Sequence, residues 1–466
     1  MADFRSPIRG LIRLTLVGFA AIIVLLTWWQ VIVADRLNAH PNNQRRMQAT
    51  QRVEPGRLYT SDGVPILGRE REGARWKSTY PEGQDFAHLT GYNAQTGLQK
   101  GLRDPLFGLG KYASPWEDLL RGEPAGNDII LTVNAAAQEL AMQELGGQRG
   151  AVVALDPRTG AVLTLASTPS FDPVRVMSNT EEFNLFRFDH GSPHLNRAIQ
   201  GLYAPGSVFK IFTAAAALDL GVATPETAFT CGGTERVARA RVVCRIGGGH
   251  GRLDLDEAMW DSCNIAFAKL GQRVGIDGFI QYAKQMHLLD EADLALPSSR
   301  GRLYDFRGFK GEVALSEASF GQGATLLSPL QIARLTAAIA NKGHVLQPYL
   351  LAEVRTPQGR VLERGKAKDL GQGVTAATAA QVTQMMVDVV EKGTGRSAAL
   401  DMTTVAGKTG SAENPQGPPH AWFTCFAPAE NPRVVVTVIV EGGGSGSGSA
   451  APIARRVLEL LLERAR

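Results

Sequence analysis

The longest uninterrupted apolar run lies near the N-terminus. Leu14 to Ala34 read LTLVGFAAIIVLLTWWQVIVA and include no charged residue. About 20 such residues cross the ~30 Å hydrocarbon core of a bilayer, whereas the apolar part of a cleaved signal peptide usually has about 7 to 15. The run therefore predicts a retained transmembrane helix. A signal peptide and a buried helix are the alternatives.

Basic residues on both sides of this run bear on its orientation. The segment before it contains Arg5, Arg9 and Arg13. Positively charged flanks stay preferentially in the cytoplasm, so we expect residues 1–13 to be cytoplasmic, residues 14–34 to span the membrane and the remainder to lie outside the cytoplasm. Arg45 and Arg46 beyond the run weaken this contrast.

Residues 35–145 show a different pattern, with short apolar runs separated by stretches such as TSDGVP and YPEGQ. Turn-forming residues between short runs of this kind are typical of strands joined by tight connections. No cluster of reactive side chains stands out in this segment. The pattern predicts a small β-rich spacer domain.

Strand-like alternation becomes strong near Arg149. GAVVALDPRTGAVLTLAST contains two β-type runs joined by the turn-forming segment Asp156 to Gly160, which predicts a β-hairpin. HAWFTCFAP and PRVVVTVIVEGG, farther along, are also strand-like. These runs indicate a second domain over residues 146–466.

Helical patterns lie between and after these strands. LSPLQIARLTAAIANKG predicts a helix in which Ser328 is the cap, Pro329 lies in the first turn and Gly343 ends it. APIARRVLELLLERAR predicts an amphipathic helix at the end of the chain. The segment GGGSGSGSA before it is expected to be a flexible turn or loop between strand and helix. The second domain is thus predicted to be mixed α/β.

Composition excludes several classes of function. Net charge is +4 over 466 residues, with no dense Lys/Arg run, so a nucleic-acid partner is not supported. The chain contains four Cys and eight His but no HExxH or paired CxxC spacing, so the sequence predicts neither a metal site nor a metal cofactor.

Candidate chemistry begins with YAPGSVFK, which runs into the apolar helix pattern IFTAAAALDLG. A helix that starts after Pro205 and Gly206 places Ser207 and Lys210 on one face. Because a buried ammonium is costly unless it is paired or loses its proton, Lys210 could act as a neutral base beside a serine nucleophile. The alternative is a capping serine with a lysine that extends to the surface.

Two further clusters favour the catalytic interpretation. Ser262-Cys263-Asn264 could be an ordinary helix cap, and Lys408-Thr409-Gly410 could be an ordinary strand end. Together with SxxK, however, SxN and KTG in this order form the motif set of penicillin-binding proteins and class A β-lactamases. Their joint occurrence by chance is improbable.

The chain resembles the class B penicillin-binding proteins, which are membrane-anchored peptidoglycan D,D-transpeptidases. NRAIQGLYAPGSVFK, HGRLDLDEAMWDSCNIAF, FGQGATLLSPLQIA and AGKTGSAENPQGPPHAWFTCFAP carry the likeness. WWQVIVADRLNAHPNNQRR and GYNAQTGLQKGLRDPLFG are similar to the short penicillin-binding protein A group. EPGRLYTSDG departs from the family, which often has Arg-Gly before the first strand. The resemblance implies a penicillin-binding/β-lactamase-like domain with an antiparallel sheet flanked by helices.

The resemblance also implies roles for the first two motifs. Ser207 would attack the carbonyl between two D-alanines of a stem peptide and form an acyl-enzyme, while Lys210 takes its proton. Ser262 would relay a proton toward the leaving D-alanine. Asn264 would hold the peptide amide. β-Lactams would acylate the same serine.

The resemblance implies that the third motif binds the substrate. Lys408 would offer positive charge to the substrate carboxylate and support Ser262, and Thr409 would hydrogen-bond that carboxylate. Gly410 would allow the substrate backbone to approach the strand. The backbone N–H groups of the nucleophile and of Ser411 would form the oxyanion hole.

Alternatives differ in what resolves the acyl-enzyme. Water would make the protein a β-lactamase or D,D-carboxypeptidase, and a protein without turnover would be a receptor for β-lactams or stem peptides. The membrane anchor and spacer favour the transpeptidase. The family resemblance further implies a place in the bacterial inner membrane, no cofactor, and a SEDS-type glycan polymerase as partner.

Four cysteines complete the candidate residues. Cys231 and Cys244 flank the turn-rich stretch GGTERVARARVV in a region expected outside the cytoplasm, where disulfides form. We expect them to be linked, which would contribute about 3 kcal/mol for a loop of this length. Two unpaired cysteines are the alternative. Cys263 and Cys425 are expected to be buried and apolar in behaviour.

Overall fold

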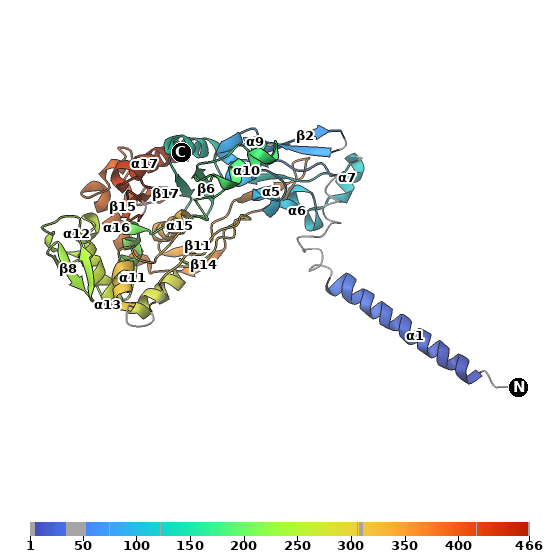
Figure 1. Ribbon diagram of the computed structural model, residues 1–466, viewed down its shortest axis with the longest axis horizontal. Coiled ribbons are helices and arrows are strands. Elements are labelled where there is room, and N and C mark those ends of the chain that lie inside the picture. The colour runs from blue at the N-terminus through green and yellow to red at the C-terminus, as the bar shows by residue number, and fades with distance from the viewer. Residues whose placement is uncertain are drawn as a thin grey trace.

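The computed structural model describes residues 5–33, 53–73, 75–121, 123–304, 306, 311–415 and 417–464. Figure 1 shows an elongated globular body and a helix, α1 (Arg5–Thr27), that lies apart from it. A π-helical turn, Trp28–Ile32, continues α1. Ile8–Ile32 is long and apolar enough to cross a membrane, with a mean hydropathy of 2.3 and no buried residue. Ala34, the predicted end of the span, lies outside the described residues.

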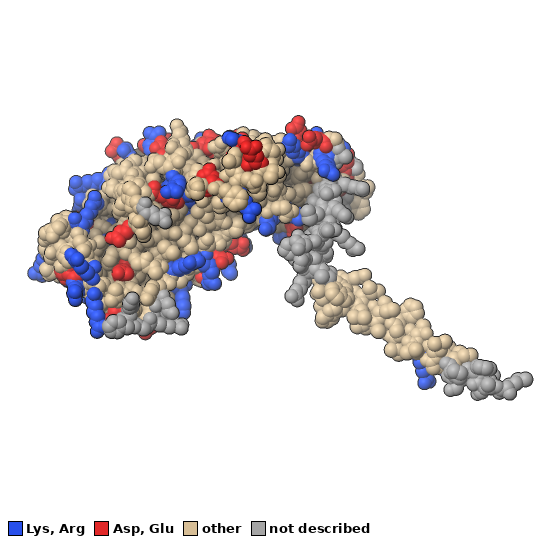
Figure 2. All heavy atoms as spheres, viewed as in Figure 1, with Lys and Arg blue, Asp and Glu red and all other residues tan. Residues whose placement is uncertain are grey.

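The surface of α1 differs from that of the body. Space-filling atoms show charged side chains scattered over the visible face of the body, whereas most of α1 carries none (Figure 2). Large apolar side chains of α1 are at least half exposed, as Leu14, Phe19 and Val24 illustrate. Such a surface is costly in water and suits a hydrocarbon environment. The helix therefore fits a membrane anchor.

A five-stranded antiparallel sheet forms the centre of the larger part of the body. Its strand order is β15-β16-β17-β5-β6. The predicted hairpin is confirmed as β5 (Gly150–Leu155) and β6 (Val162–Thr168). The two later strand predictions are confirmed as β16 (His420–Ala427) and β17 (Val434–Val440). β15 (Ala406–Ala412) lies at one edge and carries the KTG motif.

Period-two alternation assigns the side chains of this sheet to two cores. Side chains of one set pack against α8 (Ala135–Leu145) and the C-terminal helix α17 (Ala451–Arg464). Side chains of the other set face α15 (Pro329–Ala340), behind which lies α11 (Lys210–Asp219). Since successive residues of a strand point to opposite faces, a sheet covered on both sides reads as continuous apolar runs, such as VVVTVIV.

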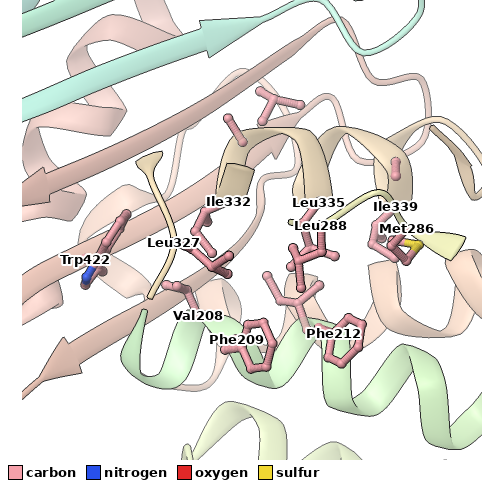
Figure 3. Close-up of a cluster of buried hydrophobic side chains, with 14 of the residues drawn as sticks. Val208, Phe209, Phe212, Met286, Leu288, Leu327, Ile332, Leu335, Ile339 and Trp422 are labelled. Atoms are coloured by element: carbon pink, nitrogen blue, oxygen red, sulfur yellow. The ribbon is translucent and has the colours of Figure 1, made fainter. Parts of the chain in front are cut away.

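The helical side of the sheet contains an aromatic core. Val208, Phe209 and Phe212 face Leu327 and the apolar side of α15, with Trp422 of the sheet nearby (Figure 3). Phe209 and Phe212 stack with ring centroids 4.9 Å apart. Burying one phenylalanine side chain stabilises a fold by about 1.5–3 kcal/mol. This core fixes the start of α11, where the SxxK motif lies.

Further elements complete the part of the body that contains this sheet. Its helices are α9 (Pro173–Val176), α10 (Thr180–Phe188), α12 (Leu255–Trp260), α13 (Asn264–Gln285), α14 (Gly311–Ala318) and α16 (Ala376–Glu391). Short hairpins and pairs are formed by β7 (Phe229–Cys231), β8 (Thr234–Val237), β9 (Ala240–Val243), β10 (Gly251–Leu253), β11 (His344–Leu346) and β14 (Asp369–Gln372). Gly275 interrupts the helical geometry of α13.

A second sheet, of six strands, occupies the predicted spacer. Its order is β13-β12-β4-β1-β2-β3, and its strands are β1 (Leu58–Tyr59), β2 (Pro65–Glu72), β3 (Arg75–Thr79), β4 (Asp128–Leu131), β12 (Leu351–Arg355) and β13 (Val361–Arg364). Short helices α4 (Ala87–Thr90), α5 (Gly97–Gly101), α6 (Arg103–Leu106) and α7 (Pro115–Arg121) accompany it. Since β12 and β13 come from beyond residue 145 and α8 packs on the other sheet, the domain boundary at 145 stays a prediction.

Two local predictions concern the segments that precede helices. Ser328 caps α15 and forms a capping box with Gln331, as the pattern indicated, and Pro329 is the first helical residue. The Gly/Ser segment connects β17 and α17, and within it Gly446–Ala450 forms a π-helical turn. Ser445 accepts a hydrogen bond from Gly448 N–H and so starts this turn.

Candidate active site

All three sequence motifs meet at one cavity of about 490 Å³. η4 (Gly206–Phe209) supplies the serine of SxxK, the connection from α12 to α13 supplies SxN, and the edge strand β15 supplies KTG. The predicted residues that line the cavity are Ser207, Ser262, Asn264, Thr409, Gly410 and Ser411. The two lysines of the motifs are fully buried next to them. The structure thus brings together every predicted site residue.

Gly206 positions the nucleophile candidate. Its φ is +57°, and a Cβ atom there would lie 2.8 Å from the carbonyl oxygen of Ser411. Gly206 N–H also donates to the carbonyl of Gly321 at 2.8 Å. Only glycine fits this positive φ at such close approach. The Pro-Gly pair therefore holds the backbone of Ser207 close to β15.

Lys210 begins α11 and makes all its recorded hydrogen bonds with the SxN motif. Its Nζ donates to the Ser262 carbonyl at 2.6 Å, to Ser262 Oγ at 3.1 Å and to Asn264 Oδ1 at 2.8 Å. Burial lowers the pKa of Lys210 to about 7. The alternative of a surface lysine is wrong, because the side chain is 0% exposed.

Ser262 lies between two amines. Lys408 Nζ donates to Ser262 Oγ at 2.9 Å, and Lys210 Nζ donates to the same atom at 3.1 Å. Burial, and then the charge of Lys210, lower the pKa of Lys408 well below its usual value. Since two buried cations this close repel each other, one of the two amines is favoured in its neutral form. A hydroxyl that touches both amines can pass a proton between the substrate and either of them.

Backbone geometry holds Ser262 in place. Its φ is +58°, in the left-handed region that non-glycine residues rarely occupy. Cys263 N–H donates to the Ala258 carbonyl at 2.9 Å, and the Asn264 amide donates to the Val243 carbonyl at 3.0 Å. The motif is therefore fixed from both sides by α12 and β9. A residue kept in a sparsely populated conformation points to a functional constraint.

β15 offers a free strand edge to the cavity. Among the described strands it pairs with β16 alone, from Ala406 opposite Phe426 to Ala412 opposite His420. Ser411 is exposed, and Thr409 shares a 2.7 Å hydrogen bond with Thr394. An unpaired edge can bind an extended peptide through main-chain hydrogen bonds. The arrangement suits a peptide substrate that lies along KTG.

Several cavity residues were not identified from the sequence. They are Val243, Cys244, Arg245, Asp261, Gln322, Thr394, Glu413, Pro419 and the run Gly444 to Ser447. Gln322 lies in FGQGATLLSPLQIA, one of the segments that carry the family likeness, and that likeness is the signal that points to it. The Gly/Ser run has no reactive side chains that would indicate a site in the sequence. It reaches the cavity because its backbone packs closely on β16, where a Cβ on Gly446 would lie 2.1 Å from the Trp422 carbonyl oxygen.

The predicted disulfide between Cys231 and Cys244 is wrong. All four cysteines are free and buried. Cys244 Sγ lies 3.5 Å from Cys263 Sγ, far beyond a disulfide bond of about 2.05 Å. Folding of β7 to β10 brings a third cysteine to the pair that the sequence suggested. Burial of Cys263 and Cys425 is confirmed.

A buried ion pair supports the segment before the nucleophile. Arg197 Nε donates to Glu441 Oε1 at 2.7 Å, and the Tyr203 hydroxyl donates to the same oxygen at 2.8 Å. The side chains of Arg197 and Glu441 are 3% and 13% exposed. Trp422 Nε1 donates to the Ala204 carbonyl at 3.0 Å. These contacts connect the end of β17 with the residues that lead into η4.

Replacing Glu441 with alanine should lower the free energy of unfolding by about 3–5 kcal/mol, because Arg197 would remain buried without its partner. Urea unfolding followed by circular dichroism measures the change. Glu182→Ala is the matched control, since its 2.7 Å ion pair with Arg175 lies on the surface and is worth about 1 kcal/mol or less. Equal effects of the two substitutions would contradict the structural role of Glu441.

Comparison with known proteins agrees with this geometry. The family model named penicillin binding protein transpeptidase domain matches residues 150–459, more than half of the chain. The chain belongs to this family. The class B resemblance indicated by the motifs is thereby confirmed, and the protein is a penicillin-binding protein of the D,D-transpeptidase type with a mixed α/β fold.

Relatives match this penicillin-binding protein over nearly its whole length. Peptidoglycan D,D-transpeptidase PbpA of Mycolicibacterium smegmatis is 33% identical and covers 97% of the chain and 98% of the relative. MrdA of Acinetobacter baumannii is 30% identical over 82% of the chain and 66% of the relative. Penicillin-binding protein A from M. tuberculosis, solved as a ceftriaxone acyl-enzyme, has a TM-score of 0.82 and 30% identity over 89% of this chain and 99% of that one.

Proposed function

We propose that Ser207 is the nucleophile with which this penicillin-binding protein cross-links peptidoglycan stem peptides. The observation that carries the proposal is the Ser262 hydroxyl, which contacts the amines of both Lys210 and Lys408 beside the cavity that Ser207 lines. A serine, a base of suitable pKa and a relay hydroxyl at one cavity are the parts of an acyl-transfer site.

Acylation uses these parts in order. Ser207 Oγ attacks the carbonyl between the two D-alanines, and its proton passes to neutral Lys210. The C–N bond then breaks, and the leaving D-alanine takes a proton through Ser262. The structure records no hydrogen bond between Ser207 and Lys210 among the described residues, and Lys210 instead holds the SxN motif. Such contacts often tighten only when substrate binds.

Substrate recognition follows from the third motif. An extended stem peptide along β15 would place its carboxylate near Thr409 and Lys408 and its reacting carbonyl near the N–H groups of Ser207 and Ser411. Binding of an anion favours the charged form of Lys408 and offsets the effect of burial on its pKa. A Cβ on Gly410 would lie 3.0 Å from Trp422, 3.1 Å from Val208 and 3.2 Å from the Pro205 carbonyl oxygen, so this glycine lets the nucleophile turn approach the strand closely. Removing one oxyanion donor typically costs about 10²- to 10³-fold in rate.

An amine from a neighbouring stem peptide then attacks the ester on Ser207. An amide bond forms, the ester C–O bond breaks and the serine regains a proton. The second candidate is hydrolysis, because Asp261 and Glu413 line the cavity and a carboxylate can activate water. In the family resemblance neither residue belongs to the three motifs, which favours the amine as acceptor.

The lifetime of the penicillin adduct distinguishes the two candidates. We expect fluorescent penicillin to label the protein, with the adduct persisting far longer than the time needed to form it, since neither carboxylate is hydrogen-bonded to Ser207 in the described residues. Gel fluorescence after removal of free label measures the decay. Loss of label within seconds would support hydrolysis. A longer-lived label in Glu413→Gln or in Asp261→Asn would then identify the carboxylate that activates water.

We also propose that α1 anchors the protein in the bacterial inner membrane with residues 1–13 in the cytoplasm and the catalytic domain outside. The exposed apolar surface of α1 supports the anchor, and the arginines before it support the direction. A membrane-impermeant penicillin should then label intact spheroplasts, whereas the opposite orientation would protect the site until lysis.

A SEDS-type polymerase in the same membrane is the proposed partner. Between residues 53 and 145 the described chain forms only part of one sheet and short helices, which supports a separate source for glycan polymerisation. Co-purification of a polytopic polymerase with the tagged protein in detergent tests this proposal. Recovery of the protein alone under conditions that retain membrane complexes would contradict it.

A further inference from the structure

Three cysteines and one histidine meet beside the SxN motif. The side-chain ligand atoms of Cys231, Cys244, His250 and Cys263 all lie within 4.8 Å of one another. Cys231 Sγ lies 3.4 Å from His250 Nδ1, and Cys244 Sγ lies 3.5 Å from Cys263 Sγ. The cysteines are buried and the histidine is half-buried. None of these four side chains has a role in the acyl-transfer site described above.

The distances distinguish between a metal site and a disulfide. Zn–S bonds of about 2.3 Å and Zn–N bonds of about 2.0–2.1 Å in a tetrahedron place neighbouring ligand atoms about 3.5–3.8 Å apart. The two shortest contacts of the cluster, 3.4 and 3.5 Å, lie near this spacing. A disulfide would pair two sulfurs and leave the third cysteine and the histidine unexplained.

The backbone around the cluster is built for close approach. Gly233 and Gly249 have φ of +88° and +77°, and a Cβ on Gly249 would lie 2.2 Å from the Cys231 carbonyl oxygen. Cys244 N–H donates to the Gly233 carbonyl at 2.8 Å. The loops after β7 and before β10 are therefore locked together backbone to backbone. They hold Cys231 and His250 in position from separate segments.

Backbone N–H groups point at the sulfurs. Ala266 N–H lies 3.5 Å from Cys263 Sγ at the start of α13. The hydrogen bond with Cys263, together with the backbone N–H groups of Ile265 and Asn264, lowers the pKa of the Cys244 thiol. N–H donors and a helix N-terminus favour a thiolate over a thiol, and outer hydrogen bonds of this kind orient metal ligands. A neutral thiol cluster would gain little from such donors.

We propose that Cys231, Cys244, His250 and Cys263 bind one Zn²⁺ in a closed tetrahedral site. Three thiols lose their protons to solvent on binding, and the neutral imidazole coordinates through Nδ1, so no oxidant or reductant is required. Twelve, five and twelve residues separate the four ligands in sequence. This spacing does not match paired CxxC, which is why composition and motif search predicted no metal site.

The site would position the SxN motif. Cys263 is the residue between Ser262 and Asn264, and Cys244 follows Val243, whose carbonyl accepts the Asn264 amide. A metal bond to Cys263 would fix the strained turn that holds the Ser262 hydroxyl between the two lysines. The metal is a positioning element here, since all four protein ligands occupy its coordination sphere and leave no place for substrate.

Metal content of the full-length protein in detergent tests the proposal. Purified without added chelator, the protein should contain about one zinc per chain by plasma mass spectrometry. Cys231→Ser and His250→Ala should each lose most of it. Cys425→Ala is the matched control, because Cys425 is equally buried but lies on β16 outside the cluster, and it should retain the metal.

Thiol counting after denaturation without reductant separates the other outcomes. Four reactive thiols together with one zinc support the site. Two missing thiols and no zinc would show a disulfide, and four thiols without zinc, even after Zn²⁺ at micromolar concentration is supplied, would show an unmetallated cluster. Either result overturns the proposal, whatever the protein's activity. Tetrahedral Co²⁺ absorption after exchange would confirm the geometry independently of variants.

Penicillin acylation measures the positioning role. Loss of zinc in Cys231→Ser should lower the second-order rate of acylation by about 10- to 100-fold, the range for outer-shell changes at metal sites. Cys231→Asp keeps a zinc ligand of similar size and should restore both metal and rate. If Cys231→Ser loses zinc but acylates at the normal rate, the metal is present without a positioning role.

Discussion

Ser207→Ala should abolish labelling by penicillin, with a loss of about 10⁶-fold in acylation rate, the size of effect reported when a nucleophilic serine is removed from a hydrolase. The expectation follows from the position of Ser207 in the lining of the cavity, where η4 places it against β15. Labelling with fluorescent penicillin and mass mapping of the modified peptide measure both the rate and the site.

A folded variant is required for this result to be informative. Ser207 is only partly buried, so its replacement by alanine removes no core contact. The urea midpoint of Ser207→Ala should therefore stay within experimental error of the parent protein's midpoint. Ser447→Ala is a matched control, because Ser447 lines the same cavity on a different element, and it should acylate close to normally. Adduct found on any residue other than Ser207 would refute the assignment.

Local patterns were sufficient to predict several of the elements that build the catalytic domain. The hairpin of β5 and β6, the two later strands and the helices α15 and α17 all lie where periodicity and capping residues indicated. Each of these signals depends on neighbours within a few residues. The residues that meet at the cavity could also be selected from the sequence, since they belong to a known motif set.

Features that depend on distant segments could not be predicted. β12 and β13 join β4 across more than 200 residues of chain, so no local pattern linked them to the spacer. Cys263 came to Cys244 only through the packing of α13 on β9. The role of Gly446 likewise depends on close approach to Trp422. Such features are determined by tertiary contacts and not by the intrinsic preferences of these residues.

Two chemically identical amines, those of Lys210 and Lys408, are proposed to have different roles at the same hydroxyl. Lys210 and Lys408 both reach Ser262 Oγ, at 3.1 and 2.9 Å. Burial lowers both pKa values, and the positive charge of Lys210 lowers the pKa of Lys408 further. Substrate carboxylate would stabilise charge on Lys408, which lies on the strand β15 proposed to bind it, and the repulsion would then favour a neutral Lys210. Substrate binding thus prepares the base.

Lys210→Ala should reduce acylation by about 10²- to 10⁴-fold, the usual contribution of a positioned base. In the parent protein burial brings the pKa of Lys210 to about 7. The neutral form increases as pH rises, so the acylation rate should increase from pH 6 to pH 8 and level off above that range. Lys210→Ala should lack this step. Stopped-flow acylation with a chromogenic β-lactam across this range measures both effects.

Two other lysines sharpen the interpretation. Lys269→Ala removes a partly exposed lysine that forms an ion pair with Glu235. This variant should keep both the acylation rate and its step with pH. Lys408→Ala should weaken the binding of carboxylate-bearing β-lactams more than it lowers the maximal acylation rate. A parent profile that is flat between pH 6 and pH 8, or a Lys210→Ala protein that acylates at the parent rate, would remove Lys210 from the role of base and leave it as a structural tie to SxN.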